Sequence, residues 1–139
     1  FFRCRLRVRG GQVRPMTDFC IQIHPDRSRD LDLARVRAIC EHLAFDNDLI
    51  KRFAFLDRPG EGSEPWHVNL IFDTDRPADL WSVLKGRLYD CDGCDGLGRL
   101  MQMSSMAMCE GEHGWRDYLL LYHYDPRERL NRFDERPEF

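Results

Sequence analysis

Long apolar runs are missing from this sequence. None approaches the roughly 18 residues that a membrane-spanning helix needs, and the N-terminal arginines are followed by no apolar segment of the kind found in secretory signals. Cysteine is present, but its spacing forms no regular disulfide framework, which favours reduced thiols. We therefore expect a soluble cytoplasmic protein.

The common catalytic motifs are absent as well. The sequence has no G-x-S-x-G nucleophile turn, no P-loop and no G-x-G-x-x-G fingerprint. Neither Ser104 nor Ser105 has a general base at a recognisable spacing. We therefore expect no cofactor, and we favour a non-catalytic role over an enzyme.

Lysine is scarce, with two residues against 19 arginines, and five of the arginines lie in residues 1–15. That segment has no acidic residue and is followed by Met16. We expect it to be a leader or a cloning remnant; its alternating pattern is also compatible with an edge strand. Without it, 16 basic and 24 acidic side chains leave a net charge of −8. Such a charge disfavours nucleic acid and favours a basic protein partner or simple solubility.

The size and composition predict one packed domain. The chain has 139 residues, of which 42% are hydrophobic and 12% aromatic, enough for a sizeable core. We place the domain at residues 16–125. The charged segment that follows, residues 126–139, is typical of a loosely held C-terminal tail.

Three segments alternate with the period of two that a β-strand requires. In residues 66–74, Trp66, Val68, Leu70 and Phe72 alternate with mostly polar residues. Residues 19–24 follow the same pattern. Residues 117–125 form the third segment, and the pattern there does not show which face is buried.

Two further segments have helical spacing, near residues 31–45 and 77–89. Residues 49–57 and 99–109 complete the expected strands, the latter with a bulge or turn at Ser104–Ser105. The order β-α-β-β-α-β-β predicts an α+β fold: a ferredoxin-like split βαβ sandwich, extended by a C-terminal strand, with helices on one face of an antiparallel sheet. The residues expected in its core are Leu33, Val36, Cys40, Leu43, Val68, Leu70, Phe72, Leu80 and Leu84.

A zinc site is one alternative that the sequence offers. Cys91, Cys94, Cys109 and His113 have C-x2-C and C-x3-H spacing, and three thiolates with one imidazole suit tetrahedral zinc. A straight strand over residues 99–108 would hold the two pairs ~30 Å apart. We therefore favour no bound metal.

Histidines and amides gather on one strand face in the expected topology. The end of the first strand, at His24, lies beside the start of the third, at His67. Gln22 and Asn69 project from the same face, and His123 joins them only if the last strand is in register. Such a cluster suits metal, anion or acid–base chemistry, while a polar open face or a dimer interface explains it without catalysis.

The segment HVNL at residues 67–70 resembles the H-x-T-Φ motif of two-histidine phosphoesterases. In those enzymes one histidine acts as base and a second as acid on a phosphodiester. Asn69 stands where that motif has threonine, and His123 is followed by tyrosine and aspartate instead of a second motif. The resemblance implies phosphoesterase-like chemistry at His67 as the enzyme alternative.

Our preferred hypothesis is a small acidic bacterial protein of the inhibitor or immunity kind, which binds a protein partner or forms a homodimer. Tyrosine and tryptophan supply binding energy at interfaces, and acidic residues steer a basic partner. The residues expected to bind the partner are Asp90, Asp92, Asp95, Trp115, Tyr122 and Tyr124.

Overall fold

The computed structural model describes residues 5–9, 12–90 and 96–133. No helix in these ranges is long and apolar enough to cross a membrane. The main strands and helices, in chain order, are β1 (Arg5–Arg9), β2 (Gln12–Ile23), α1 (Leu33–Asp46), β3 (Arg52–Arg58), β4 (His67–Thr74), α2 (Pro77–Leu84), α3 (Leu97–Ser104), β5 (Ser105–Gly111) and β6 (Gly114–Tyr122). Two short helical turns are η1 (Pro25–Arg27) and the π-helical η2 (Lys85–Tyr89).

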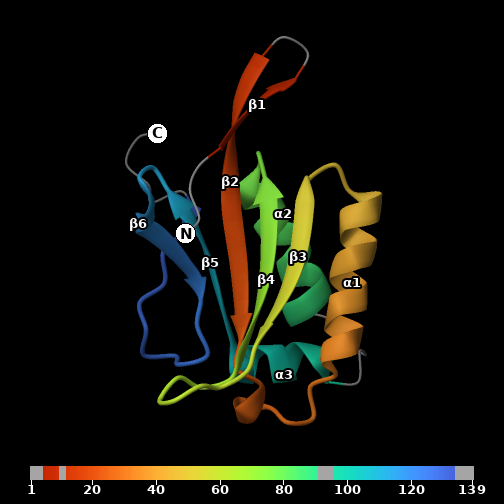
Figure 1. The fold of residues 1–139 in the computed structure, drawn as a ribbon, viewed down its shortest axis with the longest axis vertical. Coiled ribbons are helices and arrows are strands. Elements are labelled where there is room, and N and C mark those ends of the chain that lie inside the picture. The colour runs from red at the N-terminus through yellow and green to blue at the C-terminus, as the bar shows by residue number, and fades with distance from the viewer. Residues whose placement is uncertain (1–4, 10–11, 91–95, 134–139) are drawn as a thin grey trace.

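The α+β fold is confirmed: five strands form an antiparallel sheet in the order β3-β4-β2-β5-β6. β1 pairs with the first part of β2, and this hairpin projects beyond the rest of the sheet (Figure 1). β2 is therefore longer than expected and continues upstream of Met16 without a break.

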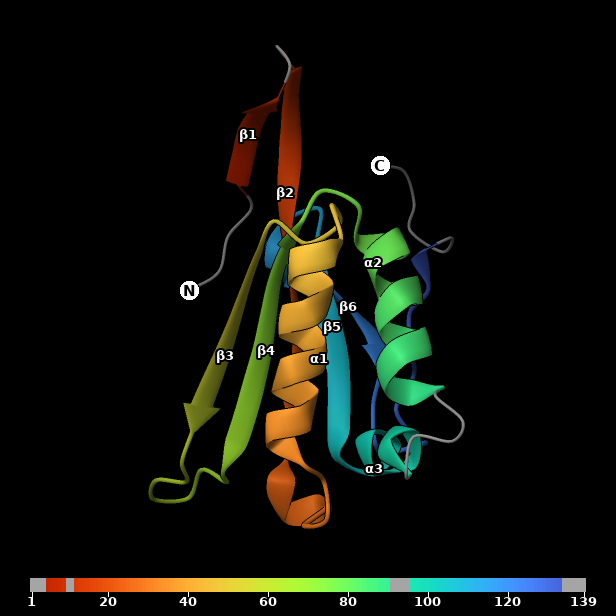
Figure 2. The ribbon, with the colours of Figure 1, turned by 90° about the vertical axis from the view of Figure 1, so that its right-hand side faces the viewer.

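The helices α1 and α2 lie on one side of the sheet, and α3 closes one end of the same layer (Figure 2). Phe19, Ile21 and Ile23 of β2 alternate inward beneath them, and β4 adds its own inward row. The residues expected in the core are buried, except Leu33, which is half-buried. α1 begins after Asp32, whose side chain caps the helix by accepting from the backbone N–H of Arg35.

One expected strand is partly wrong. Residues 97–104 form α3, and β5 begins only at Ser105. Leucine, methionine and glutamine favour helices, and Leu97 and Met101 recur four residues apart on the buried side. The hydroxyl of Ser104 donates to the carbonyl of Leu100, as serine does within a helix. The Ser104–Ser105 break is therefore a change from helix to strand.

The last strand and the tail also differ from expectation. β6 ends at Tyr122, and two register irregularities interrupt its pairing with β5. The described part of the tail is attached instead of loosely held. The N–H of Asn131 donates to the carbonyl of Leu120, the amide oxygen of Asn131 accepts from the N–H of Leu120, and Phe133 packs against the core.

Replacement of Leu70 by Ala should lower the free energy of unfolding by about 2–5 kcal/mol, because the side chain is fully buried on the inner strand β4. Chemical denaturation measures the change. Phe45→Ala is the matched control, since Phe45 is 89% exposed on α1 and its loss should change stability by about 0.5 kcal/mol or less. Equal effects of the two substitutions would contradict the described core.

Gly111→Ala should also destabilise the protein, by about 1–3 kcal/mol, because an added Cβ would collide with the backbone oxygen of Asp117. Gly86→Ala is the control: its Cβ meets open space in a helical turn, so a small gain of about 0.5–1 kcal/mol is expected. Thermal unfolding of the two variants measures both changes in stability. A neutral Gly111→Ala would rule out the close β5–β6 approach.

Candidate binding groove on the open sheet face

The face opposite the helices, here called the open face, is arranged in rows that run across the strands. The strand registers place alternate residues of β2 to β5 beside one another. In order along the strands, the rows are acidic (Asp73, Asp18, Glu110), apolar (Ala54, Ile71, Cys20, Met108), amide-bearing between apolar neighbours (Leu56, Asn69, Gln22, Met106) and basic (Arg58, His67, His24).

The acidic row is buried and bonded. Asp18, Asp73 and Glu110 are at most 2% exposed. Glu110 accepts from the backbone N–H of Asp18 at 2.7 Å, and Arg52 pairs with Asp73 at 3.2 Å. These contacts stabilise the sheet end from which the β1–β2 hairpin projects.

A groove of about 470 Å³ lies over the apolar and amide rows. Its floor consists of Cys20 and Met108, and Trp115 and Tyr118 of β6 form one wall, with ring centroids 6.4 Å apart. The volume lies within the range of small-ligand sites, which combine apolar surface with a few polar groups. Here the polar groups are Gln22, Asn69 and His67.

A chain of hydrogen bonds fixes the amides. Gln22 Nε2 donates to Asn69 Oδ1 at 3.1 Å, and Cys20 Sγ lies 3.9 Å from the same oxygen. Gln22 Oε1 is 3.0 Å from His24 Nε2, so this imidazole nitrogen is the donor. The Asn69 side chain also lines the groove, and its Nδ2 group is a donor by its chemistry.

The structure brings His24 and His67 together, with ring centroids 6.2 Å apart. His67 Nδ1 lies 3.2 Å from the carbonyl of Pro65 and therefore donates, which leaves Nε2 as an acceptor. The pKa of His24 is lowered, first by burial and then by the nearby charges of His67, Arg27 and His123. Both effects favour the neutral form of His24.

His123 lies beyond the end of β6, next to Tyr124, at a ring separation of 4.4 Å. Tyr124 in turn makes an edge contact with His24 at 5.6 Å. Arg27 lies over the Tyr124 ring, 3.9 Å from its centroid, in a cation–π contact. His123 thus approaches the histidine pair from the loop after β6 and not from within the strand.

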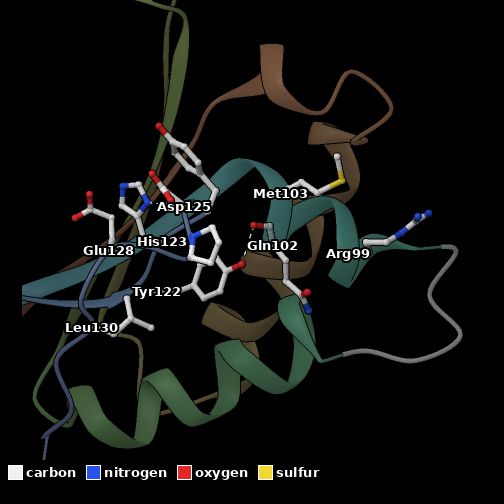
Figure 3. Close-up of a pocket in the computed structure, with 10 residues that line it drawn as sticks. Arg99, Gln102, Met103, Tyr122, His123, Asp125, Glu128 and Leu130 are labelled. Carbon is white, nitrogen blue, oxygen red and sulfur yellow. Dashed lines mark hydrogen bonds between the residues drawn. The ribbon is translucent and has the colours of Figure 1, made fainter.

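The expected partner-binding residues do not form one surface. Tyr122 lies on the helix side, against Tyr89, and its hydroxyl donates to the carbonyl of Gln102 (Figure 3). It lines a second cavity of about 510 Å³ with His123, Leu130 and other residues. Trp115 lines the groove instead. Asp90 is exposed at the end of η2, and Asp92 and Asp95 lie outside the described residues.

Of the four residues of the zinc alternative, Cys91 and Cys94 lie outside the described residues. Cys109 is buried in the core, while His113 is exposed and pairs with Asp117 at 3.1 Å. Among the described residues no three His, Cys, Asp or Glu side chains are placed to hold a metal ion. The straight strand expected over residues 99–108, which would have held the two pairs ~30 Å apart, is not present, because its first part belongs to α3.

Sequence reasoning missed three contributors to this face, namely Met108, Tyr118 and Arg27. The sequence did not show which sheet face Met108 occupies, because that depends on the residue at which β5 begins. Tyr118 was placed in the alternating last strand, but the bulged pairing was needed to assign it to the groove. The contact of Arg27 with Tyr124 joins segments 97 positions apart, for which the sequence has no signal.

The comparisons add no relative. No protein-family model, no curated protein and no solved structure matches the chain. The function must therefore be argued from the geometry of the open face.

Cys20 should resist alkylation at neutral pH. Burial, with a smaller effect of Asp18, raises its pKa to about 12, so the thiol form predominates and the reactive thiolate is scarce. Peptide mapping by mass spectrometry after iodoacetamide treatment at pH 7.5 should find Cys20 mostly unmodified in the folded protein and fully modified in guanidinium. Rapid labelling of the folded protein would contradict this, because it would require Cys20 to be exposed to solvent and present as a thiolate.

Proposed function

We propose that the protein is a small non-catalytic binding module, of the inhibitor or immunity kind, which docks a protein partner on its open sheet face. The observation that carries this proposal is the groove: two aromatic side chains, Trp115 and Tyr118, wall an apolar floor on the open face. Tyr118 is 45% exposed and available for contact. Aromatic residues around a desolvated centre are the usual source of binding energy at interfaces.

The chemistry of the groove supports binding over catalysis. Cys20, the thiol on its floor, has a pKa raised to about 12 and is a poor nucleophile at neutral pH. Gln22 bonds to Asn69 and to His24, an arrangement that holds donors and acceptors in fixed orientations. Fixed amides give a binding surface specificity at low entropic cost.

An enzyme with a histidine site on the same face is the second candidate. It is favoured by the 6.2 Å separation of His24 and His67 and by their complementary hydrogen bonds. His67 Nε2 is an acceptor that can take a proton, and the protonated form of His24 would be the partner acid. In this reading Asn69 orients the substrate, His123 adds an N–H donor, and the reaction is phosphoesterase-like.

We also propose that the fold is ferredoxin-like. The strand order β3-β4-β2-β5 and its antiparallel pairing agree with a split βαβ arrangement. β6 extends that sheet by a hairpin from β5. In such sandwiches the open face is a common place for a partner or a second copy of the chain.

Partner capture from the source organism, followed by titration calorimetry with the identified partner, tests the function. Tyr118→Ala should weaken binding by about 2 kcal/mol or more, roughly thirtyfold in Kd, because the aromatic wall is lost. Phe45→Ala, an exposed aromatic on the helix side, should bind like the unmodified protein. Sedimentation velocity of the same variants shows whether the partner is a second copy.

Two results would contradict the binding proposal. One is a partner whose affinity is the same for Tyr118→Ala and for Phe45→Ala. The other is phosphodiesterase activity that His67→Ala abolishes while thermal stability is unchanged, which would establish the histidine enzyme instead.

A further inference from the structure

Cationic side chains converge where the groove meets the end of β2. His24 follows β2, His67 begins β4, and Arg27 lies in η1. Arg58 is the register neighbour of His67 on β3 and projects from the same face. We propose that this cationic end of the open face is a binding site for an oxyanion, a phosphate or carboxylate group, carried by a ligand whose planar or apolar part occupies the groove.

Two contacts that involve no carboxylate position the guanidinium of Arg27. Its Nε donates to the carbonyl of Met103 at 3.0 Å, and its plane lies over the ring of Tyr124 at 3.9 Å. These two contacts hold the side chain from both sides and leave the two terminal NH2 groups to donate to a ligand. A planar fork of this kind is suited to a carboxylate or a phosphate.

The imidazoles add donors that increase on protonation. The Nε2–H of His24 donates to Gln22, whereas His123 Nδ1 accepts from the N–H of Asp125 at 2.9 Å, which places the proton of His123 on Nε2 as a donor. His67 donates through Nδ1 and gains a second N–H on protonation. An oxyanion bound here would favour the protonated form of a neighbouring imidazole, because opposite charges attract.

The charges around the site are unbalanced. Burial lowers the pKa of His24, and the groups that lower it further, His67, Arg27 and His123, are all basic side chains. Two nearby carboxylates have other donors: Asp125 accepts from Arg127, although it also lies close enough to His123 for that side chain to lower its pKa, and Asp57 accepts from Trp66 Nε1 at 2.7 Å. Asp26 and Glu128 are exposed on the flanking segments. An anion at the imidazoles would relieve their mutual repulsion.

The position of His67 connects this site with the groove, because the same side chain lines the cavity that Trp115 and Tyr118 wall. A ligand that places an oxyanion beside His67 therefore has its adjoining atoms over Met108 and Cys20. Aromatic and apolar groups are favoured there, and Asn69 Nδ2 supplies one further donor. The ligand class is an aryl or similarly planar phosphate or carboxylate.

Histidine NMR with simple anions tests the site. At pH 6.0 and constant ionic strength, inorganic phosphate replacing chloride should shift the ring resonances of His24 and His67 saturably and raise the pKa of His24. Arg27→Gln should weaken phosphate at least tenfold. Arg87→Gln removes the same charge from an exposed position on η2 and should leave phosphate affinity within twofold. Both variants are first checked for an unchanged melting temperature.

Phenyl phosphate and benzoate distinguish the sources of the oxyanion and test the connection with the groove. Either probe should bind more tightly than phosphate or acetate, respectively, and Tyr118→Ala should remove that gain while keeping phosphate binding. The tighter of the two identifies the anion class. Equal affinities for phosphate and phenyl phosphate, and for acetate and benzoate, would overturn the proposed ligand class.

The site itself is overturned if phosphate shifts the histidines no more than chloride does at equal ionic strength, or if Arg27→Gln and Arg87→Gln weaken phosphate equally. The result is separate from the search for a protein partner. If phosphate binds as expected but no protein partner is found, only the binding-module proposal is refuted. If a partner is found and neither phosphate nor Arg27→Gln changes its affinity, only the anion-site proposal is refuted.

Discussion

The antiparallel pairing of β2 with β4 is the constraint on which the rest of the structure depends. It places Ile21 beside Leu70 and Phe19 beside Phe72 on the inner face, where α1 and α2 cover them. A register slip of one residue would move these side chains to the open face and bring Gln22 and Asn69 into the core. The hydrophobic effect therefore selects the register, and the same register assembles the amides and imidazoles on the opposite side.

The open face shows how polar groups remain in a largely buried sheet. Glu110 bonds to the backbone of Asp18, Gln22 bonds to Asn69, and His24 bonds to Gln22. Each contact satisfies a polar group whose burial would otherwise cost stability. These bonds also preorganise the surface, because side chains held by neighbours lose less entropy when a ligand binds. The hydrogen bonds that stabilise the sheet are therefore the same ones that fix the orientation of the side chains on the open face.

Much of the fold could be predicted because its signals are local and repeated. The alternation of residues 66–74 and the helical spacing of residues 31–45 and 77–89 each recur over several turns or pleats. Residues 97–104 were misassigned because a short apolar segment with methionines suits a helix or a strand. Leu97 and Met101 are helical here because they pack into the shared core, a contact that is absent from the local sequence.

The sequence by itself determined the central strand pair, the two long helices and, through strand order, the approach of His24 to His67. These features follow from periodicity and antiparallel geometry, which a linear pattern records. Only the tertiary structure decided that Tyr118 and Trp115 wall the groove while Tyr122 packs against Tyr89, because bulges in the β5–β6 pairing change the face that a residue occupies. It also decided the contact of Arg27 with Tyr124, since long-range packing is fixed by the whole core and not by spacing along the chain.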